Sequence, residues 1–171
     1  LAWNEGSTES ASSTTPQFAL RKYTSIPGLA HILGFIQYPR ADKRGVWWRE
    51  EYAGMSGSEL AFNATLAGVN GSRMVETDAR GEVQRENIVS PAINGEDLVL
   101  SVDADVQSEL YTILLAHARA QHFDGGAAVI IDVRTGELLA LTSFPEYDNQ
   151  ALTDGLSAEI RAASTDPRKP L

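Results

Sequence analysis

Two short apolar runs, joined by Val133-Arg134-Thr135-Gly136, constrain the fold of this chain more than any other feature. The first run reads Ala127-Ala128-Val129-Ile130-Ile131 and the second reads Leu138-Leu139-Ala140-Leu141. They predict a β-hairpin, in which Gly136 can supply the positive φ of the connecting loop. Neither run alternates apolar with polar residues, as a strand with one wet face would. The hairpin is therefore expected to belong to a sheet that is covered on both faces.

A segment that can cover one of these faces precedes the hairpin. Residues 103–122 predict a helix, because Asp103 can cap its N-terminus and Asp105 puts a negative charge in the first turn, where the helix dipole favours it. Apolar residues recur at helical spacing and form one stripe: Val106, Leu110, Ile113, Leu114 and Ala118. No second segment offers a comparable cover. One face of the hairpin is therefore expected to stay exposed, with unpaired strand edges.

The middle of the chain predicts one short helix and several strands. Ser56-Gly57-Ser58-Glu59 has the pattern of a capping box, in which the Ser56 hydroxyl and the Glu59 carboxylate each bind the other residue's amide. This helix is expected to run to about Leu66 and to bury Leu60 and Ala64. Strands are expected at residues 73–77, 83–89 and 98–102, and a last short helix at residues 157–163.

These elements together predict an α+β fold in three parts. Residues 1–17 are expected to be a flexible polar segment, because small and polar residues dominate positions 4–15. Residues 18–102 are expected to form a domain of short antiparallel strands with a capped helix. Residues 103–171, with the long helix, the hairpin and a tail, are expected to begin a second domain.

The composition excludes several classes of function. The 171 residues include 23 acidic and 14 basic side chains, which give a net charge of −9. Such a chain lacks the basic footprint that nucleic acid or an anionic lipid surface requires. It contains no cysteine, and no apolar run approaches the roughly 20 residues that span a bilayer. Because the sequence opens at Leu1-Ala2-Trp3 without an initiator methionine, we expect it to be a piece of a longer protein.

A search for catalytic or ligand-binding residues gives a negative result. His31, His117 and His122 lack metal-ligand spacing, and the paired acids have no obvious pocket. No Ser-x-x-Lys, Lys-Thr-Gly, Gly-x-Ser-x-Gly or phosphate-binding loop occurs. We therefore expect no catalytic residue, no cofactor site and no metal site.

One aromatic group leaves two interpretations open. Trp47, Trp48 and Tyr52 lie close together in a charged stretch of the sequence. They can be packed side chains, the commoner case, or exposed rings that bind a glycan. Only the exposure of the rings distinguishes these interpretations.

The order of motifs resembles that of bacterial class B penicillin-binding proteins. Residues 30–35, Ala-His-Ile-Leu-Gly-Phe, are similar to the family's "A-A-H-V-L-G-Y" stretch. The other matching stretches keep the family's order: residues 21–24, 52–59, 66–71, 95–107, 126–132, 135–141 and 143–148. Thr24, Ser58 and Val133 depart from the usual proline, leucine and proline. The active-site motifs of the family would all lie beyond Leu171.

The resemblance implies the non-catalytic N-terminal module, called the dimerisation domain or pedestal, of a peptidoglycan D,D-transpeptidase. It implies that the long helix and the hairpin begin the transpeptidase fold, and that the parent enzyme is penicillin-sensitive. The implied location is extracytoplasmic, on a parent held in the membrane by an upstream anchor that this chain lacks. The implied partners are cell-wall synthesis proteins such as a glycosyltransferase.

Two further expectations concern binding. The two apolar strands of residues 127–143 lead us to expect self-association through the hairpin. The alternative to a transpeptidase module is an extracytoplasmic glycan- or protein-binding domain unrelated to transpeptidases.

Overall fold

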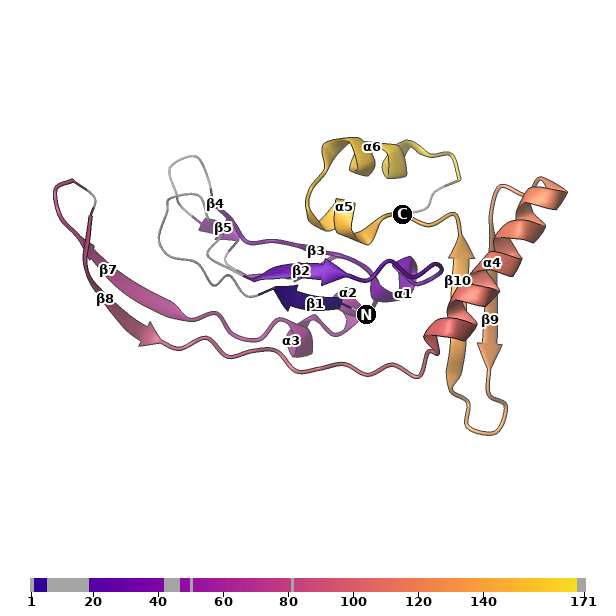
Figure 1. The fold of residues 1–171 in the computed structure, drawn as a ribbon, viewed down its shortest axis with the longest axis horizontal. Helices are drawn as coiled ribbons and strands as arrows, with labels where there is room; N and C mark the ends of the chain where they lie inside the picture. The colour runs from indigo at the N-terminus through magenta and orange to yellow at the C-terminus, as the bar shows by residue number, and fades with distance from the viewer. Residues whose placement is uncertain (1, 6–18, 42–46, 50, 81, 169–171) are drawn as a thin grey trace.

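The computed structural model describes residues 2–5, 19–41, 47–49, 51–80 and 82–168, and it is elongated (Figure 1). A long two-stranded ribbon projects at one end of the molecule, and the longest helix lies against a hairpin at the other end. The strands are β1 (Ala2–Glu5), β2 (Leu20–Tyr23), β3 (Ile36–Gln37), β4 (Arg40–Ala41), β5 (Trp47–Arg49), β6 (Ala53–Gly54), β7 (Ser72–Thr77), β8 (Val83–Ser90), β9 (Gly126–Ile131) and β10 (Leu138–Phe144). The helices are α1 (Ala30–Leu33), α2 (Gly57–Ala61), α3 (Asn63–Leu66), α4 (Ala104–Gln121), α5 (Asn149–Thr153) and α6 (Ser157–Thr165).

The strands pair two by two, always antiparallel. The pairs are β1–β2, β3–β6, β4–β5, β7–β8 and β9–β10, and within the described residues none of these sheets has a third strand. Mixed helices and short antiparallel strands confirm the predicted α+β class.

The long helix begins where the sequence predicts. The Asp103 carboxylate accepts hydrogen bonds from the amides of Asp105 and Val106, each across 3.0 Å, and so caps α4. At the other end His122 takes a left-handed conformation with φ of 58°. The predicted apolar stripe is covered only in part, because Ala118 is buried whereas Ile113 is 57% exposed.

The predicted hairpin is confirmed as β9 and β10, with Gly136 at φ +81° in the loop. Helix α4 covers one of its faces. A Cβ atom on Gly126 would lie 3.1 Å from the Leu114 side chain, so the face that carries Gly126 and, two residues on, Ala128 is turned to α4. The opposite face is covered by α1 only near Ser143, and its apolar residues Val129, Ile131 and Leu141 stay exposed, as the missing second apolar stripe predicts.

The predicted helix at residues 56–66 is wrong in its detail. It is broken at Phe62 into α2 and α3, and Ser56 occupies the N-cap position without a side-chain cap bond. Leu60, expected to be buried, is 56% exposed, and Ala64 is also exposed. Glu59 is buried instead. Its carboxylate pairs with Arg21 on β2 and does not bind the Ser56 amide as a capping box requires.

Two further expectations fail, and two hold. The sequence predicts a flexible segment at residues 1–17, but Ala2–Glu5 form β1 by pairing with β2. The rest of that segment lies outside the described residues. Residues 98–102 run without a ladder partner. The ribbon β7–β8 and the helix α6 match the predicted strands and last helix to within two residues.

Among the residues that the structure describes, the buried apolar ones are few and mostly small. They are Leu29, Ala30, Ile36, Ala118, Ala140, Ala151 and Leu152. They come from the first forty residues and from the last seventy. Apart from Ala118 on α4, they lie on or directly beside α1, β3, β10 and α5, where α1 contacts β10 and β3 contacts α5. The core therefore joins the two segments that the sequence assigns to separate domains.

Candidate functional site: a polar junction and an open hairpin

Gln107 is the central residue of the junction between these two segments. It lies on the first turn of α4, its side chain is fully buried, and its amide nitrogen donates to the Gly28 carbonyl and, across 2.7 Å, to the Leu141 carbonyl. Its amide oxygen accepts from the Leu141 amide across 2.8 Å. One side chain thus ties α4, β10 and the turn before α1 together.

Gly28 is required at that turn. Its φ is +87°, and a Cβ atom there would lie 2.8 Å from the Cβ of Tyr111 and 2.9 Å from the hydroxyl of Thr142. The Gly28 amide donates to one Glu146 oxygen across 2.9 Å, and the Ala30 amide donates to the other across 3.0 Å. The carboxylate of Glu146 therefore holds the start of α1 against the end of β10.

The short helix α5 continues this junction with three polar side chains. Asn149 donates to the carbonyls of Ala30, across 2.9 Å, and Gly34. Gln150 accepts from the Tyr23 amide across 3.1 Å and donates to the Arg21 carbonyl across 3.2 Å. Thr153 accepts from the Ile36 amide across 3.3 Å.

These contacts share one property. Polar side chains from residues 107–153 bind main-chain groups of residues 21–36, so the fit depends on backbone shape more than on the side chains of the earlier segment. They fix the orientation of β10 and α5 relative to α1 and β2.

A buried ion pair lies beside this junction. The Arg21 Nη2 donates to a Glu59 oxygen across 3.2 Å, and the Tyr23 hydroxyl donates to the other oxygen across 3.2 Å. The Arg21 Nε lies 3.0 Å from Glu59 but is not aligned for a hydrogen bond, so this contact is purely ionic. Burial, and then the charge of Glu59, raises the pKa of Tyr23. The pair joins β2 to α2.

Ser56 takes part in the same region through a tyrosine rather than through the helix amides. Its hydroxyl lies 3.0 Å from the Tyr147 hydroxyl, and the Tyr147 ring packs edge-on against His31 and Phe35. Burial raises the pKa of Tyr147. The residue that the sequence identifies as a helix cap therefore connects α2 to the segment after β10.

The hairpin leaves a group of apolar side chains uncovered at this end of the molecule. On the face turned away from α4, Val129 is 51% exposed, Ile131 49% and Leu141 42%. An apolar group of this kind on a two-stranded sheet is typical of a surface that another element covers.

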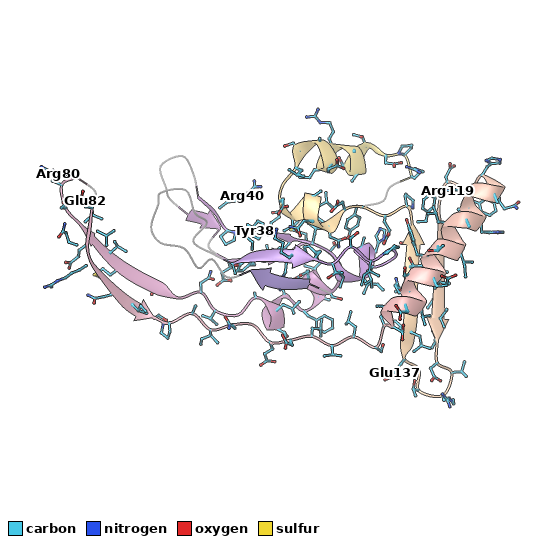
Figure 2. All side chains as sticks on the ribbon, in the orientation of Figure 1. Tyr38, Arg40, Arg80, Glu82, Arg119 and Glu137 are labelled. Atoms are coloured by element: carbon cyan, nitrogen blue, oxygen red, sulfur yellow. The ribbon has the colours of Figure 1, made fainter. Side chains whose placement is uncertain are left out.

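Of the aromatic residues Trp47, Trp48 and Tyr52, the structure describes the side-chain contacts of Tyr52. Tyr52 is half-buried, donates its hydroxyl to the Ala19 carbonyl across 2.8 Å, and packs edge-on against Tyr38. Tyr38 in turn bonds the main chain of Arg21 on β2, beside which Figure 2 places its ring. Tyr52 is therefore a packing residue. The side chains of Trp47 and Trp48 lie outside the described residues.

No cluster of metal-ligating side chains occurs in the part of the chain that the structure describes. Across the same residues, no helix is both long and apolar enough to cross a membrane. His117 packs on Phe123, whereas His31 lies 3.0 Å from the Ser143 hydroxyl, so the structure does not bring these two histidines together.

Sequence reasoning missed the residues that build the junction. Gln107, Glu146, Asn149 and Gln150 are polar, and nothing in local periodicity marks a polar residue as buried. One signal was available for Gln107, because it lies three residues before Leu110 and seven before Leu114 and so shares the apolar face of a helix that must lie against the hairpin.

Comparison with known proteins identifies this arrangement. The family model described as "Penicillin-binding Protein dimerisation domain" matches residues 12–100, more than half of the chain. Peptidoglycan D,D-transpeptidase MrdA of Escherichia coli strain K12 is 38% identical over 161 residues, which are 88% of this chain and 24% of that protein. Peptidoglycan D,D-transpeptidase FtsI of Buchnera aphidicola is 30% identical over 119 residues, which are 68% of this chain and 21% of that protein. The chain thus spans about a quarter or less of these relatives.

Solved structures agree with the sequence comparison. Penicillin Binding Protein 2X from Streptococcus thermophilus matches with a TM-score of 0.65 and 26% identity, over 82% of this chain and 20% of that one. A structure described as "Structural coordination of polymerization and crosslinking by a peptidoglycan synthase complex" matches with a TM-score of 0.64 and 28% identity, over 88% of this chain and 29% of that one. The chain belongs to the penicillin-binding protein dimerisation domain family.

Proposed function

We propose that this chain is the non-catalytic interaction module of a peptidoglycan D,D-transpeptidase, and that it positions the start of the catalytic domain during cell-wall synthesis. The polar junction around Gln107 carries this proposal. Side chains from residues 107–153 fix the hairpin and α5 on the main chain of residues 21–36. A module that orients a following domain needs such a junction, because loose packing would leave the orientation undefined.

Location and partners follow from the same proposal. The chain works outside the cytoplasm, and it contacts the membrane only through an anchor upstream in its parent. It interacts with itself through the hairpin of residues 127–143 and with other cell-wall synthesis proteins, among them a glycosyltransferase. Two features support this: the exposed apolar hairpin face, and a similar structure whose description names a peptidoglycan synthase complex.

The alternative of a domain unrelated to transpeptidases is overturned by the family match. Its glycan-binding version also loses Tyr52, since that ring is packed and its hydroxyl is bonded.

A chimera tests the positioning role. Residues 1–171 replace the corresponding segment of Escherichia coli MrdA, and growth is measured in cells depleted of their own MrdA. We expect the chimera to support growth and its Gln107→Leu variant to fail at the same expression level. Val99→Ser, at a position that is 90% exposed, is the control and should behave as the parent chimera does. Normal growth with Gln107→Leu would contradict the proposal.

Sedimentation of the 171-residue chain over a range of concentrations tests self-association. We expect a dimer that dissociates on dilution. A monomer at every concentration would remove self-association from the proposal and leave the positioning role to the chimera.

A further inference from the structure

Arg21 and Tyr23 on β2 are bound from two sides, by their side chains and by their main chain. The two residues alternate along the strand, so their side chains lie on the same face. Both side chains donate to the carboxylate of Glu59 on α2, one to each oxygen. The Glu59 side chain is 6% exposed and that of Arg21 12% exposed, so water competes little for these bonds. Directional, charge-assisted contacts therefore fix β2 on α2.

The main chain of the same two residues is bound by α5. Gln150 accepts from the Tyr23 amide and donates to the Arg21 carbonyl, two groups on one edge of β2. Among the described residues, no hydrogen bond or ion pair joins α2 to α5 directly. The position of β2 on α2 is therefore passed to α5 through Gln150.

Gln150 is also the residue that prevents α5 from rolling. The helix has three polar attachments on three different elements: Asn149 binds α1, Gln150 binds β2, and Thr153 binds the amide of Ile36 on β3. Asn149 and Thr153 are four residues apart and lie one above the other on the same side of the helix. Those two attachments alone would permit α5 to roll about a line along its axis. Gln150 lies about 100° further round the helix, and its bonds to β2 block this rotation.

We propose that the Arg21–Glu59 pair is kept for orientation: it sets the position of β2 on α2, and Gln150 transfers this position to α5 and so to the chain that follows β10. Arg21, Glu59 and Gln150 are then positioning residues. This inference rests on the proposed function, in which the chain after β10 begins the catalytic domain, and it names the contacts that set the orientation of that chain.

The chemistry of the pair suits orientation better than stability. A buried ion pair adds little net stability, because the cost of removing both charges from water offsets their attraction. Apolar side chains of similar volume would pack in its place, but their contacts have no preferred direction. Hydrogen bonds at both Glu59 oxygens do have one. Replacing the pair by apolar residues should therefore disturb the orientation of α5 more than the stability of the fold.

A distance between two spin labels measures this orientation. The chain has no cysteine, so Ala61→Cys on α2 and Ala158→Cys on α6, both at exposed positions, take the labels at defined sites. Pulsed electron paramagnetic resonance of this labelled chain should give one narrow distance. Adding Arg21→Met with Glu59→Leu should leave a cooperative thermal melt but broaden or shift the distance.

A second variant tests the transfer through α5. Gln150→Leu leaves the ion pair in place and should broaden or shift the distance in the same way. The controls make the same changes at exposed positions: Arg80→Met with Glu82→Leu at the tip of the ribbon, where Figure 2 labels both residues, and Gln121→Leu on α4. Both controls should keep the narrow distance.

Each other outcome overturns the inference. A double variant with the wild-type distance shows that the pair does not set the orientation, and one that fails to fold shows that the pair serves stability. A changed distance in the double variant but not in Gln150→Leu shows that the position is not transferred through Gln150.

The proposed function is judged separately, by growth of the MrdA chimera. If the chimera supports growth and its Gln107→Leu variant does not, an unchanged label distance removes only this inference. If the chimera fails while the distances change as expected, the proposed function fails and the account of the pair within this chain remains.

Discussion

Gln107 and Leu141 bind each other twice, through 2.7 Å and 2.8 Å hydrogen bonds between one side-chain amide and both main-chain groups of one strand residue. The side chain thus takes the place of a neighbouring strand on the outer edge of β10. Because Gln107 is fully buried, no water can replace it there without rearrangement.

Gln107→Leu is therefore expected to destabilise the fold strongly. It leaves the Leu141 amide and carbonyl without a partner, at about 1–3 kcal/mol for each such group. The Gly28 carbonyl keeps only the Thr142 hydroxyl, across 3.3 Å. Urea unfolding measures the loss. Gln121→Leu, the same change at an exposed position on the same helix, should cost less than about 0.5 kcal/mol. Equal midpoints for the two variants would refute this account of the junction.

Glu59→Gln is expected to cost up to about 3–5 kcal/mol, because it leaves the largely buried Arg21 guanidinium, whose side chain is 12% exposed, without its counter-charge. The double variant Arg21→Met with Glu59→Leu removes both charges and should recover much of this loss. Thermal melts of the three proteins decide the matter. Glu82→Gln, at an exposed position on the tip of the ribbon that Figure 2 labels, is the control. A double variant less stable than Glu59→Gln would mean that packing, not charge, dominates the cluster.

The sequence predicted the elements whose signals are local. Asp103 caps α4 because the cap needs only the next three residues, and Gly136 turns the hairpin because the loop needs only a positive φ. The exposed hairpin face was also predictable. Two apolar strands need cover on both faces, and the sequence contains one amphipathic helix, α4, that can cover one of them.

What failed depends on partners distant in sequence. Glu59 has the spacing of a capping residue, but its carboxylate reaches Arg21, 38 residues earlier, and so the capping box does not form. Asn4 and Glu5 have no strand propensity, and they form β1 because β2 offers an edge. The junction joins residues more than 100 positions apart, and no local pattern specifies such pairs.

Ser56→Ala tests which partner the Ser56 hydroxyl has. If Ser56 capped the helix, Ser56→Ala would lower the free energy of unfolding by about 1 kcal/mol whether or not Tyr147 were present. In the structure the Ser56 hydroxyl bonds the Tyr147 hydroxyl instead. We therefore expect Ser56→Ala and Tyr147→Phe to be non-additive, with a coupling energy of about 0.5–1.5 kcal/mol in a double-mutant cycle. Additive losses would show that the two hydroxyls do not interact.

The chain is expected not to be acylated by β-lactams. Its lysines are Lys22, Lys43 and Lys169, and none has a serine three residues before it. Without Ser-x-x-Lys and Lys-Thr-Gly no serine has the activating lysine that this chemistry needs. Incubation with a fluorescent penicillin should leave no band on a denaturing gel, while a penicillin-sensitive D,D-transpeptidase in the same gel is labelled. A stoichiometric band on the chain would contradict its assignment as a non-catalytic module.

Alkaline pH is expected to unfold the protein through its tyrosines. The pKa of each of the chain's five tyrosines is raised, chiefly by burial, and Tyr23 also faces the Glu59 carboxylate. A raised pKa means that the folded protein holds the phenol proton more tightly than the unfolded chain does. Stability is therefore unaffected below pH 10 and falls as pH rises above it, by up to about 1.4 kcal/mol per pH unit for the buried Tyr23 and by less for the more exposed tyrosines.

Tyr23→Phe isolates the largest contribution to this fall. The variant loses the hydrogen bond to Glu59, which lowers its stability at pH 7 by about 1 kcal/mol. It also loses one titrating group, so its free energy of unfolding should fall less steeply between pH 10 and about 11 than that of the wild type. Urea unfolding at several pH values measures both slopes. Tyrosinate absorbance should appear at a lower pH in the denatured chain than in the folded protein. Parallel slopes would mean that Tyr23 titrates alike in both states and would contradict this account of its contact with Glu59.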